Sequence, residues 1–283
     1  MTFSRAEVAE MLTRHGLAPR RAFGQNFVVD ANTVRKIARL ANVGAGDHVL
    51  EIGAGLGSLT LALAETGANI TAVEIDNGIV EVLRANTAHL KNVEVIHGDA
   101  MQLDWQPLLK QSAQWHVVAN LPYNVATIMV ADLLDGIAEV KHMVVMVQSE
   151  VADRLVARAG SDAYGAVSVK IDYWATSKIV GQVPSSVFLP QPRVESSLVE
   201  ICRRDKPGVE DVSAKELFTL VRAGFAKRRK MLRRALDEIA TPADFLSANV
   251  SAEARAEELD LASWGRLRQA IDTRQKSAAT QNK

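Results

Sequence analysis

The segment Val49-Leu50-Glu51-Ile52-Gly53-Ala54-Gly55-Leu56-Gly57 decides the fold. It places a short apolar run directly before three glycines at alternate positions, and residues 58–66 then have a helical pattern that ends at Gly67. Glycine lets a backbone turn sharply and approach a ligand closely. The segment therefore predicts a strand, a tight turn and a helix, with a ligand bound over the turn; a tight turn without a ligand is the alternative.

The same order of strand and helix repeats along the chain. Further strands are predicted at 69–75, 93–96, 117–119 and 143–147, with helices at 80–88 and through Glu150, Leu155 and Val156, and two later strands at 179–183 and 198–201. This alternation predicts an α/β domain with a mostly parallel sheet and helices on both faces. In such sheets ligands bind at the carboxyl ends of the strands.

The two ends of the chain are organised differently. Ser4 and Glu7 form a capping-box pattern that opens a helix ending at Gly16, and Asp30 is placed to cap a second helix. A polar break at 203–208 is followed by helical patterns only. We therefore expect an α/β domain over residues 1–205 and a small all-α domain over residues 206–283, with a frayed tail after Arg274.

The composition is that of a globular protein, with 283 residues, 48% of them hydrophobic and 23% charged, and no net charge. No apolar run approaches the length of a membrane span and no signal segment opens the chain, so we expect a cytoplasmic protein with no membrane partner. The single cysteine, Cys202, cannot form an internal disulfide, and no Cys/His cluster surrounds it in the sequence. We expect an inert thiol, no metal and, by default, a monomer.

Glycine spacing and strand-end acids indicate the type of ligand. A dinucleotide fingerprint would require glycine where Ser58 stands, whereas Glu51 before the glycines is typical of methyltransferases. Glu74 ends the next strand, where an acid accepts hydrogen bonds from ribose hydroxyls, and Asp76 is a weaker candidate. Asp99 ends the third strand and is placed to accept from an adenine amino group. Each acid alone is equally well explained as a solvated loop carboxylate, but three at successive strand ends favour a nucleotide cofactor.

The tetrapeptide Asn120-Leu121-Pro122-Tyr123 ends the fourth strand. An adenine amino nitrogen is a poor nucleophile because its lone pair is delocalised into the ring. The side-chain oxygen of Asn120 and the backbone carbonyl of Leu121 are placed to accept its two hydrogens, and Tyr123 offers a face on which a base stacks. Catalysis would then rest on positioning and electrostatics. A proline turn with a buried tyrosine is the alternative, and it loses weight beside the glycine segment.

These motifs carry a resemblance to a known family. Together with Gly24-Gln25-Asn26-Phe27, Gly98-Asp99-Ala100, Phe188-x-Pro190-x-Pro192-x-Val194-x-Ser196 and Phe225-x-x-Arg228-Arg229-Lys230, they make the chain resemble the ribosomal RNA adenine N6-dimethyltransferases over nearly its whole length. The resemblance is greatest to the bacterial small-subunit type. It implies a Rossmann-like class I methyltransferase domain followed by a small all-α domain.

The resemblance also implies a cofactor, a reaction and site residues. The cofactor is S-adenosylmethionine, held by Asn26, Val28, Gly53, Gly55, Glu74, Asp99 and Asn120. The catalytic set is Asn120, Leu121, Pro122, Tyr123 and Phe188. In that set Tyr123 and Phe188 would sandwich a flipped adenine, although from the residues alone Phe188 is a core residue. The implied reaction transfers two methyl groups to each of two adjacent adenines near the 3′ end of 16S rRNA, in the small ribosomal subunit or its precursor.

A basic run extends from Arg222 to Arg234 without an acid. We expect phosphate contacts from Arg222, Lys227, Arg228, Arg229, Lys230 and Arg233, with Arg20 and Arg21 extending the surface. Such contacts supply affinity and no sequence readout; a solvated helix face is the alternative. Ser149 and Arg234 stand where the family commonly has lysine and asparagine, which affects only the detail of the RNA contacts.

Four other functions share some of these sequence features. An enzyme that modifies adenine in large-subunit rRNA is disfavoured by the Phe188-x-Pro190-x-Pro192 segment and by the run from Phe225 to Lys230. A small-molecule N-methyltransferase would have little use for a basic helical domain. A ribosome-assembly factor is compatible with the enzyme, and an Asp99 or Asn120 variant that still binds precursor particles would separate the two roles. A nicotinamide dehydrogenase is disfavoured by Ser58 and by the lack of a hydride-transfer acid or base.

Overall fold

The computed structural model of the chain describes residues 2–20, 23–122 and 125–281, apart from the side chains of 279–281. By its internal contacts the chain divides into two compact units, residues 1–152 with 178–203 and residues 153–177 with 204–283. Each unit is described by itself. No helix in the described part of the chain is both long enough and apolar enough to cross a membrane.

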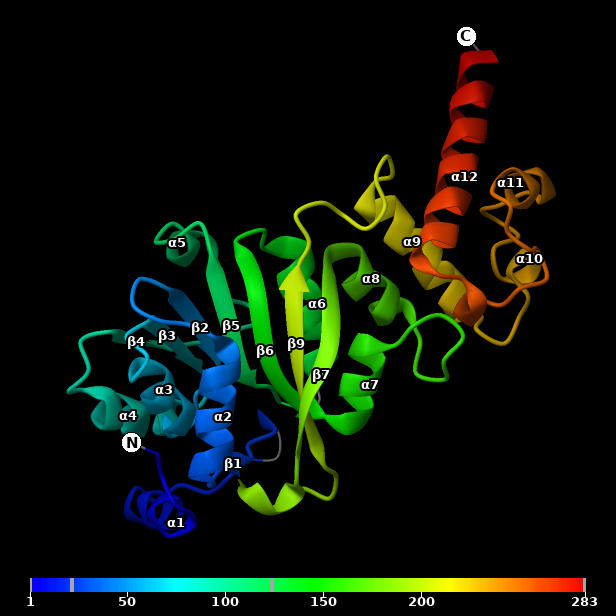
Figure 1. Cartoon of the computed structure of the whole chain (residues 1–283). Helices are drawn as coiled ribbons and strands as arrows, with labels where there is room; N and C mark the ends of the chain where they lie inside the picture. The colour runs from blue at the N-terminus through cyan, green and yellow to red at the C-terminus, as the bar shows by residue number, and fades with distance from the viewer. Residues whose placement is uncertain (1, 21–22, 123–124, 282–283) are drawn as a thin grey trace. The chain divides into compact units, whose positions relative to one another are not determined.

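A seven-stranded sheet forms the centre of the first unit in the described residues (Figure 1). Its order is β4-β3-β2-β5-β6-β9-β7. The strands are β2 (His48–Ile52), β3 (Asn69–Glu74), β4 (Val93–His97), β5 (Trp115–Asn120), β6 (Val140–Gln148), β7 (Ala175–Val183) and β9 (Ser196–Arg203). From β4 to β6 neighbouring strands run parallel, and β9 joins β6 antiparallel. The strand order reverses between β2 and β5, which is where a ligand crevice forms in sheets of this kind.

Helices α2 (Ala31–Ala41) and α3 (Ser58–Ala64) cover one face of this sheet. Val34, Ile37 and Leu63 pack with Val118 and Val144 in one apolar cluster. The other helices that include residues of this unit are α1 (Arg5–Arg14), α4 (Asn77–Thr87), α5 (Gln106–Leu109), α6 (Ala126–Gly136), which lies behind the sheet in Figure 1, and α7 (Ser149–Val156). The predicted α/β class is therefore confirmed.

Local capping signals are found as predicted. The Ser4 hydroxyl accepts from the backbone N–H of Glu7 while the Glu7 carboxylate accepts from that of Ser4, which completes the capping box of α1. Asp30 caps α2 by accepting from the Thr33 N–H at 2.6 Å. Helix α6 was not predicted, because its residues are apolar on most sides and lack a clear period.

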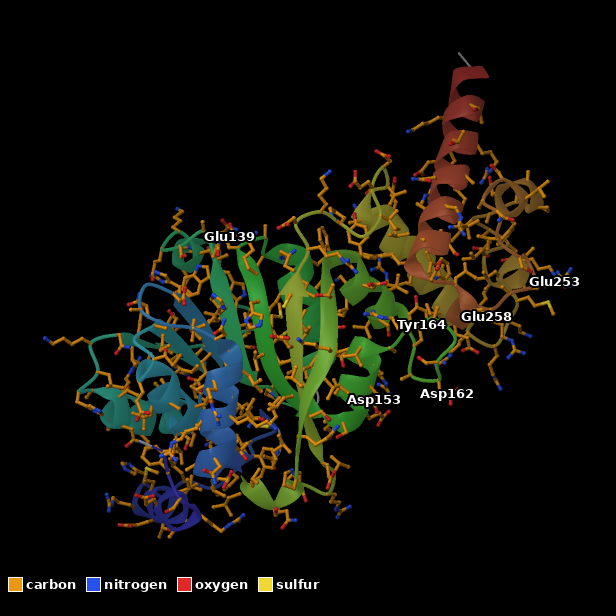
Figure 2. The ribbon with its side chains drawn as sticks, viewed as in Figure 1. Glu139, Asp153, Asp162, Tyr164, Glu253 and Glu258 are labelled. Carbon is orange, nitrogen blue, oxygen red and sulfur yellow. The ribbon has the colours of Figure 1, made fainter. Side chains whose placement is uncertain are left out.

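The second unit is helical and has its own core. Its elements after α8 (Ala166–Trp174) are α9 (Ala214–Ala226), α10 (Leu232–Ala235), α11 (Pro242–Ser247) and α12 (Leu261–Gln281), with short 3-10 turns such as Ala256–Glu258. Tyr164, which is labelled in Figure 2, packs into this core with Phe218 and Trp264. Its hydroxyl donates to the Leu259 carbonyl at 3.0 Å. Residues 153–177 therefore pack with the helices after 204, whereas the sequence prediction put them in the first domain.

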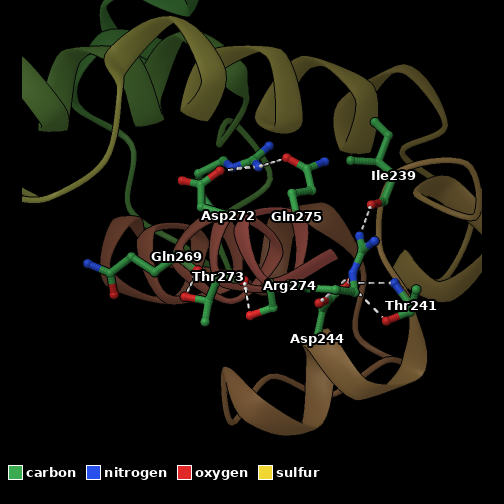
Figure 3. A network of polar contacts seen from close by, with 10 residues as sticks. Ile239, Thr241, Asp244, Gln269, Asp272, Thr273, Arg274 and Gln275 are labelled. Atoms are coloured by element: carbon green, nitrogen blue, oxygen red, sulfur yellow. Dashed lines mark hydrogen bonds and ion pairs between the residues drawn. The ribbon is translucent and has the colours of Figure 1, made fainter. Parts of the chain in front are cut away.

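Helix α12 continues through Gln281, and the expected fraying after Arg274 stays a prediction. Arg274 itself is held by side-chain contacts. Its Nε donates to both carboxylate oxygens of Asp244, at 3.0 and 2.9 Å, and its Nη2 donates to the Ile239 carbonyl at 3.0 Å (Figure 3). Asp244 is 2% exposed and also caps α11 through Thr241. These bonds tie α12 to α11.

Candidate active site

The glycine turn after β2 forms the floor of a pocket. Gly55 and Gly57 have φ angles of +58° and +97°, a region that side chains disfavour. Neither position has room for a Cβ, which would lie 3.2 Å from the Phe27 ring at Gly55 and 2.9 Å from Leu83 Cδ1 at Gly57. The turn leads into α3 through Gly57, as the sequence predicts. Glycine is therefore favoured at both positions, and the turn that they shape lines the pocket through Gly53, Ala54 and Gly55.

Glu74, at the end of β3, braces this turn. Its Oε2 accepts from the Gly55 N–H at 2.8 Å, and its Oε1 accepts from the N–H groups of Ile75 and Asp76, both at 3.0 Å. Burial raises the pKa of the Glu74 carboxyl, and these amide hydrogen bonds oppose that rise. A carboxylate has about four acceptor positions. Glu74 therefore has room for a further donor, such as a ribose hydroxyl, and it lines the pocket.

Asp76, the weaker ribose candidate, has a structural role in this geometry. Its Oδ1 accepts from the Gly78 N–H at 3.1 Å, and its Oδ2 accepts from Gln25 Nε2 at 3.1 Å. The Arg20 guanidinium lies 3.5 Å from the same Oδ2, although its side chain is 59% exposed. Asp76 therefore tethers the loop that precedes β1 (Phe27–Val28). Arg21, also predicted to contact RNA, lies outside the described residues.

Glu51 also lies at the candidate site, although its place in the sequence motif predicted no binding role for it. It is 1% exposed and lines the pocket, and burial raises the pKa of its carboxyl to about 8. Its Oε2 has no hydrogen-bond partner among the described residues. The sequence feature that could have identified Glu51 as a site residue is its position as an acid within an otherwise apolar strand segment. A buried carboxyl oxygen without a partner is costly, and it is well suited to a cationic group of a ligand.

The pocket continues into a second hollow at the ends of β3 and β4. Both hollows are lined by Gly53 and Pro122, and the second also by Asp99. Asp99 accepts from the Met101 N–H at 2.9 Å and from Gln102 Nε2 at 3.0 Å. Ile75 and Met101, which are 38% and 39% exposed, give this hollow apolar walls. An acid beside apolar walls suits a flat ring that carries an amino group.

Asn120 lies at the carboxyl end of β5 and lines the first hollow. Its Nδ2 donates to the backbone carbonyl of Asn26 at 3.0 Å. Only the amide nitrogen can donate to a carbonyl, so this bond fixes the orientation of the side chain and leaves Oδ1 as the acceptor. Leu121 is 1% exposed and its N–H donates to the Met146 carbonyl at 3.1 Å. The predicted Tyr123 lies outside the described residues.

The opposite wall of the pocket comes from β1 and the residue before it. Asn26 and Val28 line the pocket as predicted for cofactor contacts. Strand β1 pairs antiparallel with β8 (Phe188–Leu189), with Val28 opposite Phe188. Phe188 is wholly buried and packs with Val34 and Ile37 in the core that α2 forms on the sheet. Among the described residues Phe188 does not line the pocket, so its role as a stacking wall stays a prediction.

The predicted phosphate contacts from 222 to 233 lie in the second unit and are exposed. Arg228 is tied down, because its Nε donates to Glu257 at 2.5 Å and its Nη2 donates to the Asp162 carbonyl at 2.9 Å. Lys227 and Arg233 face Asp237 and Glu253 at 3.6 and 3.7 Å, which are loose surface pairs; Glu253 and Asp162 are labelled in Figure 2. Arg222 donates to the Thr219 hydroxyl. RNA binding by this set stays a prediction.

Comparison with known proteins identifies relatives over most of the chain. A family model described as ribosomal RNA adenine dimethylase matches residues 16–273. The ribosomal RNA small subunit methyltransferase A of Streptomyces coelicolor is 43% identical over 272 residues, which cover 93% of this chain and 94% of that protein. The protein of the same name from Bifidobacterium longum subsp. infantis is 41% identical over 285 residues, which cover 95% of this chain and 93% of that protein.

Two solved structures have the same fold. A dimethyladenosine transferase from Plasmodium falciparum is similar with a TM-score of 0.73 and 22% identity, covering 87% of this chain and 97% of that one. The 23S rRNA methyltransferase ErmE is similar with a TM-score of 0.69 and 24% identity, covering 87% and 100%. At these identities the likeness concerns the fold alone. The family assignment rests on the sequence matches, by which this chain belongs to the ribosomal RNA adenine dimethylase family.

Proposed function

We propose that this protein transfers methyl groups from S-adenosylmethionine to the N6 amino groups of two adjacent adenines near the 3′ end of 16S rRNA, in the small ribosomal subunit or its precursor. The observation that carries the proposal is the orientation of Asn120. Its amide oxygen is left as an acceptor at the switch point of the sheet, beside the glycine turn. The names of the relatives that match most of the chain support the small subunit as substrate.

The pocket residues fit this cofactor group by group. Glu51 offers a buried oxygen without a partner to an ammonium group, and Glu74 has acceptor capacity for the ribose hydroxyls. Asp99 would accept from the adenine amino group between Ile75 and Met101. The backbone of the glycine turn would face the methionine portion. When bound, S-adenosylmethionine supplies a methyl group activated by a positively charged sulfur.

Asn120 would prepare the nitrogen that receives the methyl group. If its Oδ1 accepts one amino hydrogen and the Leu121 carbonyl accepts the other, the nitrogen becomes pyramidal and its lone pair is freed from the ring. Donors and acceptors fixed in advance cost no reorganisation during the reaction. No strong base is required, because the nitrogen loses its proton readily once it is methylated. Tyr123 and Phe188 stay the predicted walls on which the base stacks.

The test uses purified protein, labelled S-adenosylmethionine and 30S subunits that lack 3′-end methylation, with 50S subunits as the matched control. The product is digested to nucleosides and searched for N6,N6-dimethyladenosine. We expect label in this nucleoside from 30S subunits alone. Label from 50S subunits would place the enzyme in the large-subunit class. Absence of label from both, with cofactor binding intact, would contradict the proposed substrate.

A further inference from the structure

A group of metal-ligating side chains lies at the opposite end of the sheet from the pocket. His116, His142, Glu200 and Cys202, named here the His/Cys cluster, come from strands β5, β6 and β9. His116 is the second residue of β5 and Asn120 is its last. Four residue steps along the strand separate them by about 13 Å. The cluster is therefore independent of the cofactor site.

Strand register brings the cluster together on one face. His116 lies opposite His142 in the parallel pair of β5 and β6, and His142 lies opposite Cys202 in the antiparallel pair of β6 and β9. Glu200 precedes Cys202 by two residues and so projects from the same face of β9. One ligand atom each from His142, Glu200 and Cys202 lie within 4.8 Å of one another. In the sequence these residues are up to sixty positions apart, so no local pattern around Cys202 indicates the cluster.

The distance between two ligand atoms of the cluster is close to the distance between two ligands of one zinc ion. His142 Nε2 lies 3.2 Å from Glu200 Oε1. Two ligands on one tetrahedral zinc ion, bound at about 2.0–2.3 Å, are separated by about 3.5 Å. The pair is thus already at ligand spacing. Cys202 is exposed and needs to approach by only about an ångström.

The groups around these three ligands fix their orientation. His116 Nδ1 lies 3.4 Å from His142 Nδ1. When the His142 ring donates the Nδ1 proton of this pair to His116, its Nε2, which faces Glu200 Oε1, carries the lone pair that a metal requires. Lys178 Nζ holds the other carboxylate oxygen, Glu200 Oε2, at 2.6 Å. In proteins, metal ligands are commonly oriented by hydrogen bonds from surrounding residues in this way.

We propose that His142, Glu200 and Cys202 bind a Zn²⁺ ion, with His116 and Lys178 orienting the ligands. Nitrogen, oxygen and sulfur ligands together suit zinc, and hard ions such as Mg²⁺ are disfavoured by the thiolate. On binding, the S–H bond of Cys202 breaks, the sulfur binds the metal, and the proton passes to the buffer. Solvent completes the fourth position. The ion would link β6 to β9.

Cobalt(II) substitution tests the site directly, because tetrahedral cobalt with a thiolate ligand gives a sulfur-to-metal charge-transfer band. Cys202 is the only cysteine in the chain, so such a band reports on it alone. The tag-free, reduced protein is titrated with Co²⁺ and then with Zn²⁺. We expect a band that saturates at one equivalent of Co²⁺ and disappears when Zn²⁺ displaces the cobalt.

Four variants separate a built site from a thiol that binds metal by itself. We expect Cys202→Ser to abolish the band, and His142→Ala and Glu200→Gln each to lower the Co²⁺ affinity by at least about tenfold. His116→Phe should lower it about 10- to 100-fold, as loss of an orienting group does. His89→Ala, which removes an exposed histidine elsewhere, is the matched control and should leave the titration unchanged. Circular dichroism and cofactor binding confirm that each variant is folded.

Two results would overturn the proposal. One is the absence of a thiolate band in the folded wild-type protein at saturating Co²⁺. The other is a band that persists with unchanged affinity in folded His142→Ala and Glu200→Gln proteins, which would mean that Cys202 binds the metal alone. The Cys202→Ser protein should retain methyl transfer, so failure of this proposal and failure of the proposed function are distinguishable.

Discussion

At the scale of single residues, burial of Glu51 lowers the stability of the fold at high pH, and we propose that the same carboxyl binds the cofactor. Its carboxyl is buried and its pKa is raised from 4.5 to about 8. The folded protein therefore keeps this proton to a higher pH than the unfolded chain does. The stability associated with the neutral carboxyl is complete below the unfolded pKa and is lost as the pH rises through about 8.

Glu51→Gln removes this dependence, because an amide stays neutral at every pH. We expect the variant to gain stability over the wild type as the pH rises from about 5 to about 9, by up to about 5 kcal/mol. It should also bind S-adenosylmethionine more weakly, by about tenfold, because an amide, unlike the carboxyl, cannot give up a proton and become the anionic partner of the ammonium group. Urea unfolding across this pH range and calorimetric titration measure the two effects. A stability difference that is constant with pH would contradict the titration of Glu51.

Asn120 is the residue whose chemistry the sequence predicted most directly. Asn120→Ala removes the acceptor for the amino hydrogen, and we expect kcat to fall roughly 10²–10³-fold. Asn92→Ala is a matched control, because Asn92 Nδ2 also donates to backbone carbonyls, those of Ala64 and Ala68. That variant should lose stability and keep its kcat. Single-turnover kinetics with saturating cofactor measure the chemical step. Equal decreases in kcat in the two variants would mean that Asn120 affects catalysis only through the stability of the fold.

At the scale of elements, two helical glycines differ in the space that surrounds them, so substitution by alanine should have opposite effects on stability. A Cβ at Gly224 of α9 would lie 2.6 Å from the Trp264 ring of α12, whereas a Cβ at Gly136, the last residue of α6, would meet nothing within 4 Å. We therefore expect Gly224→Ala to destabilise the protein by about 1–3 kcal/mol through overpacking. Gly136→Ala should instead stabilise it, by up to about 1 kcal/mol, through helix propensity. Thermal unfolding measures both, and changes of the same sign would contradict the packing of α9 on α12.

Elements and caps that are determined by residues close in the sequence were predictable from the sequence. The glycine turn, the strand-end acids and the caps at Ser4 and Asp30 are all local patterns, and the structure has them. What the sequence could not predict depends on contacts between distant segments. The register of β6 with β9 places His142 beside Cys202, and the pairing of β1 with β8 buries Phe188. No periodicity within either strand carries that information.

At the scale of the whole molecule the net charge is zero, but basic residues are concentrated in the segment 222–234. The phosphate contacts predicted for the second unit differ in how firmly they are held. Arg228 is engaged by Glu257, whereas neither Arg229 nor Lys230 has an acidic partner among the described residues. Both side chains are exposed between α9 and α10. A free cation is available to a phosphate without first breaking an ion pair, so these two should supply more RNA affinity than the others.

The double variant Arg229→Gln, Lys230→Gln tests this surface through salt dependence. Each phosphate contact releases counterions, so losing two should reduce the slope of log affinity against log salt concentration by about 1.5. RNA affinity should fall at every salt concentration, most at low salt, while cofactor affinity stays unchanged. Lys91→Gln, Lys110→Gln removes the same charge from exposed positions in the first unit and serves as the control. Filter binding of 30S subunits over a salt series gives both slopes. If the two double variants reduce the slope equally, net charge explains the effect and a localised contact at 229–230 does not.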